Sequence, residues 1–242
     1  MRVDHNLHHG CAGLRAEPNC LTCETRPFSV CSVLSGEELT MLNALAHPVR
    51  FGPKDTLLVQ GQAAPTVYNI TSGTARLYTL LPDGRRQIVG FALPGDFIGL
   101  SMHETASISV DAIDSVGACA FPRVTYSALA DAKPFLLRRL HDLATHELTL
   151  AQEQMMLLGR RSAEEKIICF LLTMQQRWAR IGRSSVTVPL PMSRQDIADF
   201  LGLTIETVSR TLTRLARDRM ILLVPDGVRL LNTNHLQLVA AA

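Results

Sequence analysis

The sequence has no long hydrophobic segment and no apolar stretch behind its charged N-terminus. Its longest apolar run, residues 167–172, is far shorter than the ~18 residues that a membrane-spanning helix needs. The first ten residues, MRVDHNLHHG, lack the apolar core of a secretory signal peptide. With 47% hydrophobic and 19% charged residues, the composition is that of a globular protein. We therefore expect a cytoplasmic protein with no membrane partner, in which reduced cysteines serve as ligands or reactive groups.

The signatures of common enzyme sites are also missing. No glycine-rich dinucleotide-binding loop follows a β-rich segment, and no Ser/His/Asp or paired-carboxylate constellation has local spacing. There is no internal repeat or low-complexity segment. These absences argue against an enzyme, and an iron–sulfur redox protein stays as a remote alternative only because of the cysteines described below.

The net charge of +2 is divided unevenly along the 242 residues. Residues 1–158 carry 12 Lys and Arg against 15 Asp and Glu, whereas residues 159–242 carry 12 against 7. Eleven of the twelve bases in the second segment are Arg. A basic C-terminal third on an acidic body predicts a module that faces nucleic acid. A solvated basic face is the alternative.

Glycines divide residues 49–130 into short β-rich runs. Pro82-Asp83-Gly84 is a tight-turn signal that joins two of these runs as a hairpin. Many short strands at regular spacing predict an antiparallel sandwich or barrel. The expected strands are Thr56–Val59, Val67–Ile70, Ala75–Leu81, Gln87–Leu93, Ile108–Ile113 and Gly117–Phe121.

Residues 134–158 form a long helical pattern, with two apolar stripes of heptad spacing. A helix on the surface of one domain needs only one apolar face, so the second stripe predicts a homodimer seam. One broad core stripe is the alternative. The core stripe is Leu136, Leu140, Leu143, Glu147, Leu150, Gln154 and Leu157. The predicted seam is Leu137, His141, Ala144, Leu148, Ala151, Met155 and Leu158.

The C-terminal residues have the pattern of a winged helix-turn-helix. A helix over residues 163–179 and a short β pair come first. A serine-capped helix then begins at Ser193 and ends at Gly202, and a second helix runs from Thr204 to about Arg217. Residues 220–231 form a hairpin around Pro225-Asp226-Gly227.

In this motif the second helix lies in the major groove of DNA, with its first side chains on base edges. The exposed positions are expected to be Glu206, Ser209 and Arg210, of which Arg can bond guanine and Glu can accept from cytosine. A small helical bundle with a charged face is the alternative. The positions expected to face the domain core are Ile205, Val208 and Leu212. Phosphate contacts are expected from Arg194, Thr204, Thr207, Thr211 and Arg214.

Four of the six cysteines lie in residues 1–34, where no periodicity predicts a core. Cys20, Cys23 and Cys31 form a tight trio, and Cys119 stands at the end of a predicted strand. Four thiolates can hold an iron–sulfur cluster or a tetrahedral zinc ion, and the spacing alone does not choose between them. Cys169, inside an apolar helix, is expected to be a buried small hydrophobe.

A glycine-rich β domain, a long helix and a winged helix-turn-helix, in that order, resemble the CRP/FNR family of bacterial transcription regulators over nearly the whole chain. The segment LGLTIETVSR, residues 201–210, resembles the recognition helix of the FNR branch, whose Glu-x-x-Ser-Arg pattern reads palindromes of the form TTGAT-N4-ATCAA. The resemblance assigns base contacts to Glu206, Ser209 and Arg210. The cyclic-AMP branch has an Arg before the Glu, where this sequence has Ile205.

The same resemblance implies a cofactor and a signal. FNR-type oxygen sensors bind a [4Fe–4S] cluster through three N-terminal cysteines and one in the β domain, which assigns Cys20, Cys23, Cys31 and Cys119 as ligands. The seven-residue interval between the second and third cysteine resembles that of alphaproteobacterial FNR-like and FixK-like regulators. The resemblance implies a dimer that binds palindromic double-stranded DNA and controls anaerobic or microaerobic genes. It also implies contacts with RNA polymerase through residues 84–90 and the loop around Gly95-Asp96.

The expected fold class is α+β. The expected domains are a cysteine-rich arm (1–34), an antiparallel β jelly-roll sensor like cyclic-nucleotide-binding domains (35–132), a dimerisation helix (133–159) and a winged helix-turn-helix domain (160–242). The alternatives within the family are sensing by zinc, by haem or by a cyclic nucleotide. Haem would bind nitric oxide or carbon monoxide through His103, His141 or His146 and leave the cysteines unexplained. A cyclic nucleotide is disfavoured because residues 101–115 contain no Arg or Lys for its phosphate.

Overall fold

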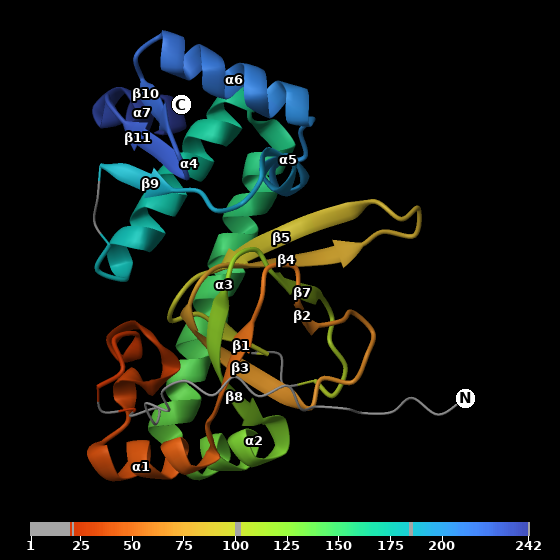
Figure 1. Cartoon of the computed structure of the whole chain (residues 1–242), viewed down its shortest axis with the longest axis vertical. Helices are drawn as coiled ribbons and strands as arrows, with labels where there is room; N and C mark the ends of the chain where they lie inside the picture. Colours follow the sequence, from red (N-terminus) through yellow and green to blue (C-terminus); the bar gives the residue numbers. More distant parts are fainter. Residues whose placement is uncertain (1–19, 21, 100–102, 184–185, 242) are drawn as a thin grey trace.

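The computed structural model describes residues 20, 22–99, 103–183 and 186–241. Residues 1–19 and 21 of the expected arm lie outside this described part. Figure 1 shows the β domain at one end of the molecule and the C-terminal helical domain at the other, with one long helix running between them. This arrangement confirms the predicted α+β architecture. None of the helices in the described part is long and apolar enough to cross a membrane.

The β domain consists of two four-stranded antiparallel sheets within the described residues, with strand orders β1-β8-β3-β6 and β2-β7-β4-β5. Side chains such as Ile70, Val110 and Val116 are fully buried between them. Strand alternation therefore produces the core as the glycine-divided pattern predicts. The strands are β1 (His47–Phe51), β2 (Thr56–Leu58), β3 (Thr66–Ser72), β4 (Ala75–Leu80), β5 (Arg86–Ala92), β6 (Phe97–Ile98), β7 (Ser109–Ala112) and β8 (Val116–Pro122).

Several elements of this region differ from the sequence-based expectation. Strands β1 and β6 and helices α1 (Gly36–Leu45) and α2 (Arg123–Ala132) were not expected. Helix α1 begins with a capping box in which Ser35 and Glu38 bond each other's backbone, a signal that the sequence does carry. Helix α2 follows Pro122 with no side-chain cap, so no start signal marks it. Cys119 lies in the middle of β8, not at its end.

Helix α3 (Pro134–Arg160) is the long helix, and its first turns pack on the last residues of the expected arm. The short 3-10 helix η2 (Val30–Val33) contacts this helix, and the 3-10 helix η1 (Arg26–Phe28) packs on η2. Leu136 and Leu140 are buried in one cluster with Val30 and Tyr126. The start of α3 is thus fixed by the arm, by α1 and by α2 together.

The C-terminal domain contains the predicted helix-turn-helix and wing. Its core includes Ile167, Leu171, Val208 and Leu212. The expected short β pair is wrong: β9 is a single strand that pairs with β11, so the wing is a three-stranded sheet. The last helix was also not expected. The elements are α4 (Ala163–Arg180), β9 (Thr187–Pro189), α5 (Arg194–Leu201), α6 (Ile205–Arg217), β10 (Ile221–Val224), β11 (Gly227–Leu230) and α7 (Thr233–Ala241).

The β domain and the C-terminal domain share apolar contacts through strand β5. Ile88 and Phe91 of β5 belong to the same buried cluster as the core of the C-terminal domain. The ring of Phe91 lies 5.4 Å from that of Phe200 and 6.2 Å from that of Phe170, measured between centroids. The two domains are therefore held in contact by buried aromatic side chains.

Gly202, in the turn between α5 and α6, has a left-handed backbone with φ +62°. A Cβ there would meet only an ordinary contact with Leu158, so the cost of Gly202→Ala is that of the backbone conformation. We expect the substitution to lower the free energy of unfolding by about 1–2 kcal/mol. Urea unfolding followed by the fluorescence of Trp178, the single tryptophan, measures it. Gly36→Ala is the control, because a Cβ at Gly36 meets nothing within 4 Å, and an equal loss in both variants would contradict the assignment.

Candidate DNA interface and thiol site

Helix α6 lies at the end of the molecule farthest from the β domain (Figure 1). Glu206, Ser209 and Arg210 are exposed on its first turns, whereas Val208 and Leu212 are buried in the domain. The three residues predicted to contact bases therefore share one solvent-facing side of a helix. This is the arrangement that places side chains in a major groove.

The turn before α6 is fixed by its own hydrogen bonds. Gly202 closes α5, and the backbone N–H of Leu203 donates to the carbonyl of Ala198 at 3.0 Å. Thr204 caps α6 by accepting from the N–H of Thr207 at 3.2 Å, and the two hydroxyls are 3.0 Å apart. These contacts hold the start of α6 rigidly against α5.

Two of the predicted roles around α6 are wrong. Thr211 is only 6% exposed, because it lies on the inner face of the helix with Val208, so it does not reach a phosphate. Ile205 is 38% exposed and does not face the core, because it stands at the first residue of α6.

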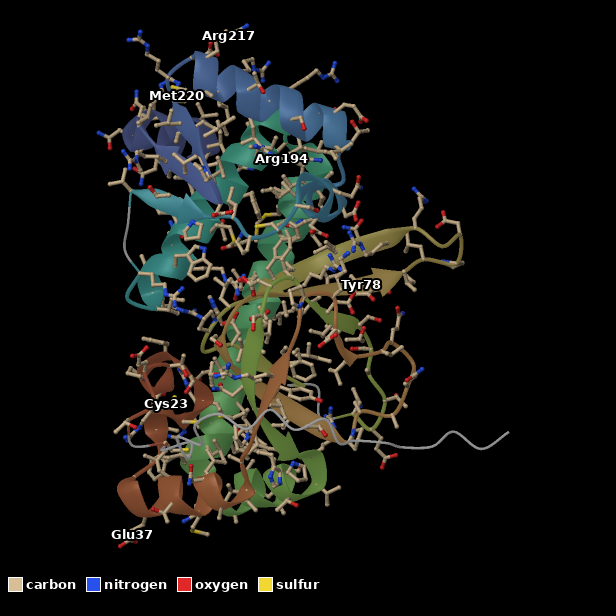
Figure 2. All side chains as sticks on the ribbon, viewed as in Figure 1. Cys23, Glu37, Tyr78, Arg194, Arg217 and Met220 are labelled. Atoms are coloured by element: carbon tan, nitrogen blue, oxygen red, sulfur yellow. The ribbon has the colours of Figure 1, made fainter. Side chains whose placement is uncertain are left out.

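The two arginines predicted to bind phosphates, Arg194 and Arg214, are paired or partly buried within the chain. Arg214 pairs with Glu164 at 2.7 Å, so a phosphate contact would require it to leave that exposed ion pair. Nη1 of Arg194 is buried without a hydrogen-bond partner in the described structure. Burial also lowers the pKa of this guanidinium. Figure 2 shows Arg194 on α5, below α6 in the view.

The two stripes of α3 have different surroundings. In the core stripe, Leu136 and Leu140 are buried and Leu143, Leu150 and Leu157 are half-buried. The predicted seam is open to solvent, except for the half-buried Leu158: Leu137, Leu148 and Met155 are 50%, 59% and 65% exposed, and His141, Ala144 and Ala151 are exposed as well. Exposed apolar side chains in a row are typical of a protein–protein contact, so the seam stays a prediction with a suitable surface.

Sequence reasoning missed two large exposed side chains on the same helix. Phe135 and Met156 are each 67% exposed, and Met156 directly follows the seam residue Met155. The strict heptad pattern excluded both, although an apolar residue directly beside a seam position, such as Met156, is a usable signal for a wider contact.

The four cysteines assigned as ligands lie in one region, between η2, β8 and the start of α3. Cys20, Cys31 and Cys119 belong to one apolar cluster. Burial raises the pKa of the Cys31 thiol to about 12, and charges on Cys20, Cys119 and Cys23 add to the shift. Burial raises the pKa of Cys119 to about 11, again with Cys20 and Cys23 contributing. The four thiols therefore lie in the same part of the molecule, close enough for their charges to influence one another.

The thiols have the hydrogen bonds of neutral groups. The Cys20 thiol donates to Oδ1 of Asn43 at 3.1 Å, and Cys23 shares a hydrogen bond of 3.2 Å with Thr25. In the described part of the chain, no three Cys, His, Asp or Glu side chains are close enough together to hold a metal ion. Metal binding would therefore require the thiols to lose their protons and leave these partners.

Two buried polar atoms near the thiols have no hydrogen-bond partner in the described structure. They are Oδ1 of Asn69, whose residue pairs with Cys119 across the sheet, and the hydroxyl of Tyr126. Burial raises the pKa of Tyr126, and the charge of Cys31 adds to this effect. Unpaired buried polar atoms call for an explanation, and a bound group among the thiols is one. By its chemistry, the set of four thiols fits a thiolate-ligated metal group.

Cys169 differs from the other described cysteines. It is half-buried, not fully buried as expected, and its sulfur accepts a hydrogen bond of 3.2 Å from Arg161. It lies in α4, outside the thiol region, and is not one of the expected ligands.

A cavity of about 870 Å³ lies between the β domain, α3 and α4. Its lining includes the guanidinium groups of Arg123, Arg161 and Arg177. Arg123 donates to the carbonyls of Ala64 and Gly99, Arg161 donates to the carbonyl of Ala240, and Arg177 pairs with Asp96. All three guanidinium groups make intramolecular contacts, so a cyclic-nucleotide phosphate would have to compete with these partners.

The segment that contains the three arm cysteines, residues 20–31, which we call the thiol segment, contacts a loop that binds the C-terminal domain. The ring of Phe28 in η1 lies so close to Gly95 that a Cβ there would be 3.1 Å from it. The next residue, Asp96, pairs with Arg177 and Arg180 of α4 at 2.6 and 3.6 Å. Gly95 is buried and Asp96 is paired, so the expectation that this loop faces RNA polymerase is wrong, whereas Arg85 in the β4–β5 turn is exposed.

A β-sheet sensor-like domain, a long helix with an open apolar stripe and an exposed recognition helix define a bacterial transcription regulator of the helix-turn-helix class. The family model described as bacterial regulatory proteins, crp family, matches residues 190–221, and the cyclic nucleotide-binding domain model matches residues 48–133. The chain belongs to the crp family and, by its relatives, to the FNR/FixK type of transcriptional activators.

Two relatives and one solved structure illustrate the similarity. The chain is 50% identical over 232 residues to the transcriptional activatory protein AadR of Rhodopseudomonas palustris, and this match covers 96% of each chain. It is 47% identical over 229 residues to the nitrogen fixation regulation protein FixK of Bradyrhizobium diazoefficiens, and that match covers 93% of this chain and 97% of the relative. The structure of FixK2 from Bradyrhizobium japonicum matches with a TM-score of 0.76 at 34% identity, over 81% of this chain and 98% of that one. Regulators of this family bind DNA and act as dimers.

Arg210→Ala is expected to weaken discrimination at the contacted guanine by roughly 1–3 kcal/mol, because a bidentate donor to the base edge is lost. Competition between cognate and guanine-substituted duplexes measures the change. Arg217→Ala is the matched control, since Arg217 is an exposed arginine at the far end of the same helix (Figure 2). An unchanged base preference in Arg210→Ala would contradict the assignment.

Proposed function

We propose that this regulator senses oxygen through a [4Fe–4S] cluster held by Cys20, Cys23, Cys31 and Cys119. In this proposal, it binds a TTGAT-N4-ATCAA-like palindrome as a homodimer and controls anaerobic or microaerobic genes together with RNA polymerase. The observation that supports it best is that the four thiols lie in one region at the start of α3, where burial and the charges on Cys20 and Cys23 raise the pKa of both Cys31 and Cys119.

The chain's own residues supply the coupling. Cys31 lies in η2, which packs on the first turns of α3 through the cluster that contains Val30, Leu136 and Leu140. A cluster bound there would supply an oxygen-labile covalent link between the arm and β8. The link favours the placement of η2 against α3 that leaves the seam free for a second copy.

Dimerisation then sets the spacing of the two DNA-reading helices. Pairing of two α3 helices along Leu137, Leu148 and Met155 would bury side chains that are now exposed. Two recognition helices about 34 Å apart match half-sites one turn of DNA apart. Ala144 and Ala151 in the seam allow the two helices to approach closely, which makes this pairing easy to form.

Zinc in place of the cluster is the second candidate, because four thiolates also satisfy a tetrahedral zinc ion. Zinc would make the same link between arm and barrel, but the link would not respond to oxygen. Iron, zinc and acid-labile sulfide, measured on anaerobically purified protein, distinguish the two. Colourless protein with one zinc and no sulfide would overturn the sensor proposal.

Cys119→Ala is expected to abolish retention of iron and sulfide, because it removes the ligand that comes from the β domain. Cys169→Ala is the matched control, since Cys169 lies outside the thiol region and bonds Arg161 instead. Iron and acid-labile sulfide per chain, together with the visible absorption spectrum, measure the effect. Equal loss of iron in both variants would contradict the ligand assignment.

A further inference from the structure

The β4–β5 hairpin holds the helix-turn-helix by a group of charged side chains that no DNA or metal role explains. Arg86 donates through Nη2 to Oδ2 of Asp199 at 2.7 Å and to Oδ1 of Asp196 at 2.8 Å. Its Nε donates to the same oxygen of Asp199 at 3.0 Å. Arg76 of β4 donates through Nη1 to the same Oδ1 of Asp196, at 3.1 Å. We call these four residues the hairpin clamp.

The hairpin clamp is largely shielded from water. The side chain of Asp196 is 4% exposed, that of Asp199 16%, and those of Arg76 and Arg86 18% and 25%. Ion pairs that are shielded from water add little to the net stability of a protein. Separating their charges, however, costs much free energy, so they strongly disfavour any arrangement that breaks them. The clamp is therefore suited to selecting one orientation of the two domains.

Two further contacts of β5 with α5 lie next to the hairpin clamp. The side-chain amide of Gln87, next to Arg86, donates to the backbone carbonyl of Asp199 at 2.6 Å. The ring of Phe91 packs on that of Phe200. The polar and apolar contacts of β5 thus meet the same helix, α5, at several points along its length.

The helix that the clamp holds is the first helix of the DNA-reading motif. Asp196 also belongs to the capping box of α5 with Ser193, so its carboxylate is fixed to the helix that it anchors. Helix α5 in turn is joined to α6 by the short turn at Gly202. An orientation imposed on α5 is therefore imposed on the recognition helix.

We propose that Arg76 and Arg86 are positioning residues that set the angle of the recognition helix relative to α3 and so specify the spacing between the two half-sites. This inference rests on the proposed binding of a palindrome by a homodimer. Because both recognition helices are placed by the same clamp in each copy, loosening it changes which half-site spacings the dimer accepts, without changing how one helix reads one half-site.

The test uses the full chain, purified anaerobically, and three duplexes: the TTGAT-N4-ATCAA palindrome, the same half-sites with a five-base-pair spacer, and a single half-site. Fluorescence anisotropy titrations at one salt concentration give the affinities. The variants are Arg86→Gln, Asp199→Asn and their double mutant. Arg85→Gln is the matched control, because Arg85 follows the same turn but its exposed side chain pairs with Asp83 of that turn and, within the described part of the chain, not with the C-terminal domain.

We expect Arg86→Gln and Asp199→Asn each to weaken binding to the four-base-pair palindrome by roughly tenfold, a common size for coupling between two sites. Affinity for the five-base-pair palindrome and for the half-site should stay unchanged, so the preference for the shorter spacer shrinks. The double mutant should lose no more than Arg86→Gln alone, because Arg86→Gln already removes the Arg86–Asp199 pair that Asp199→Asn breaks. Arg85→Gln should behave as the wild type.

Each other outcome overturns the inference in a distinguishable way. If the wild type prefers one spacer and Arg86→Gln keeps the same preference, the clamp does not position the helix, although the proposed palindrome binding stands. Equal loss on all three duplexes shows damage to the reading surface itself. If the wild type does not distinguish the two spacers, the proposed dimeric mode of binding fails together with the inference.

Discussion

Helix α3 touches the thiol segment, the β domain and the C-terminal domain, and its packing constrains all three. Its buried stripe joins Leu136 and Leu140 to the arm and to α2, and further along Gln154 donates to the carbonyl of Phe200 in α5 at 2.8 Å. The opposite stripe remains open. A change in how η2 packs on the start of α3 therefore acts on the same helix that carries the predicted seam and contacts the helix-turn-helix domain.

The charge asymmetry of the sequence has two structural uses. The excess of arginine in the C-terminal third was interpreted as a DNA-facing charge, and Arg210 is placed for that role. Arg177 and Arg180, however, point to Asp96 of the acidic β domain. The hairpin clamp has the reverse arrangement, with arginines on the β domain and aspartates on α5 of the helix-turn-helix. Opposite charges on the two domains thus also hold them together.

The elements with strong local signals were predictable from the sequence. The glycine-divided strands, the proline-initiated α3 and the serine-capped α5 ending at Gly202 lie close to their expected residues. Helix α2 and strand β6 were missed because one lacks a cap and the other has two residues. The inner position of Thr211 depends on how α6 rotates in its domain, and the pairing of Arg86 with Asp199 joins residues more than one hundred positions apart. Local patterns contain no information on such contacts.

The most direct test of the account follows one anaerobic sample through exposure to oxygen, with palindrome affinity and acid-labile sulfide measured together at each time. The account predicts that affinity for the palindrome falls in proportion to the sulfide lost, while binding to unrelated DNA changes little. A protein that keeps its full affinity for the palindrome after all sulfide is lost would contradict the claim that the four thiols control DNA binding through α3.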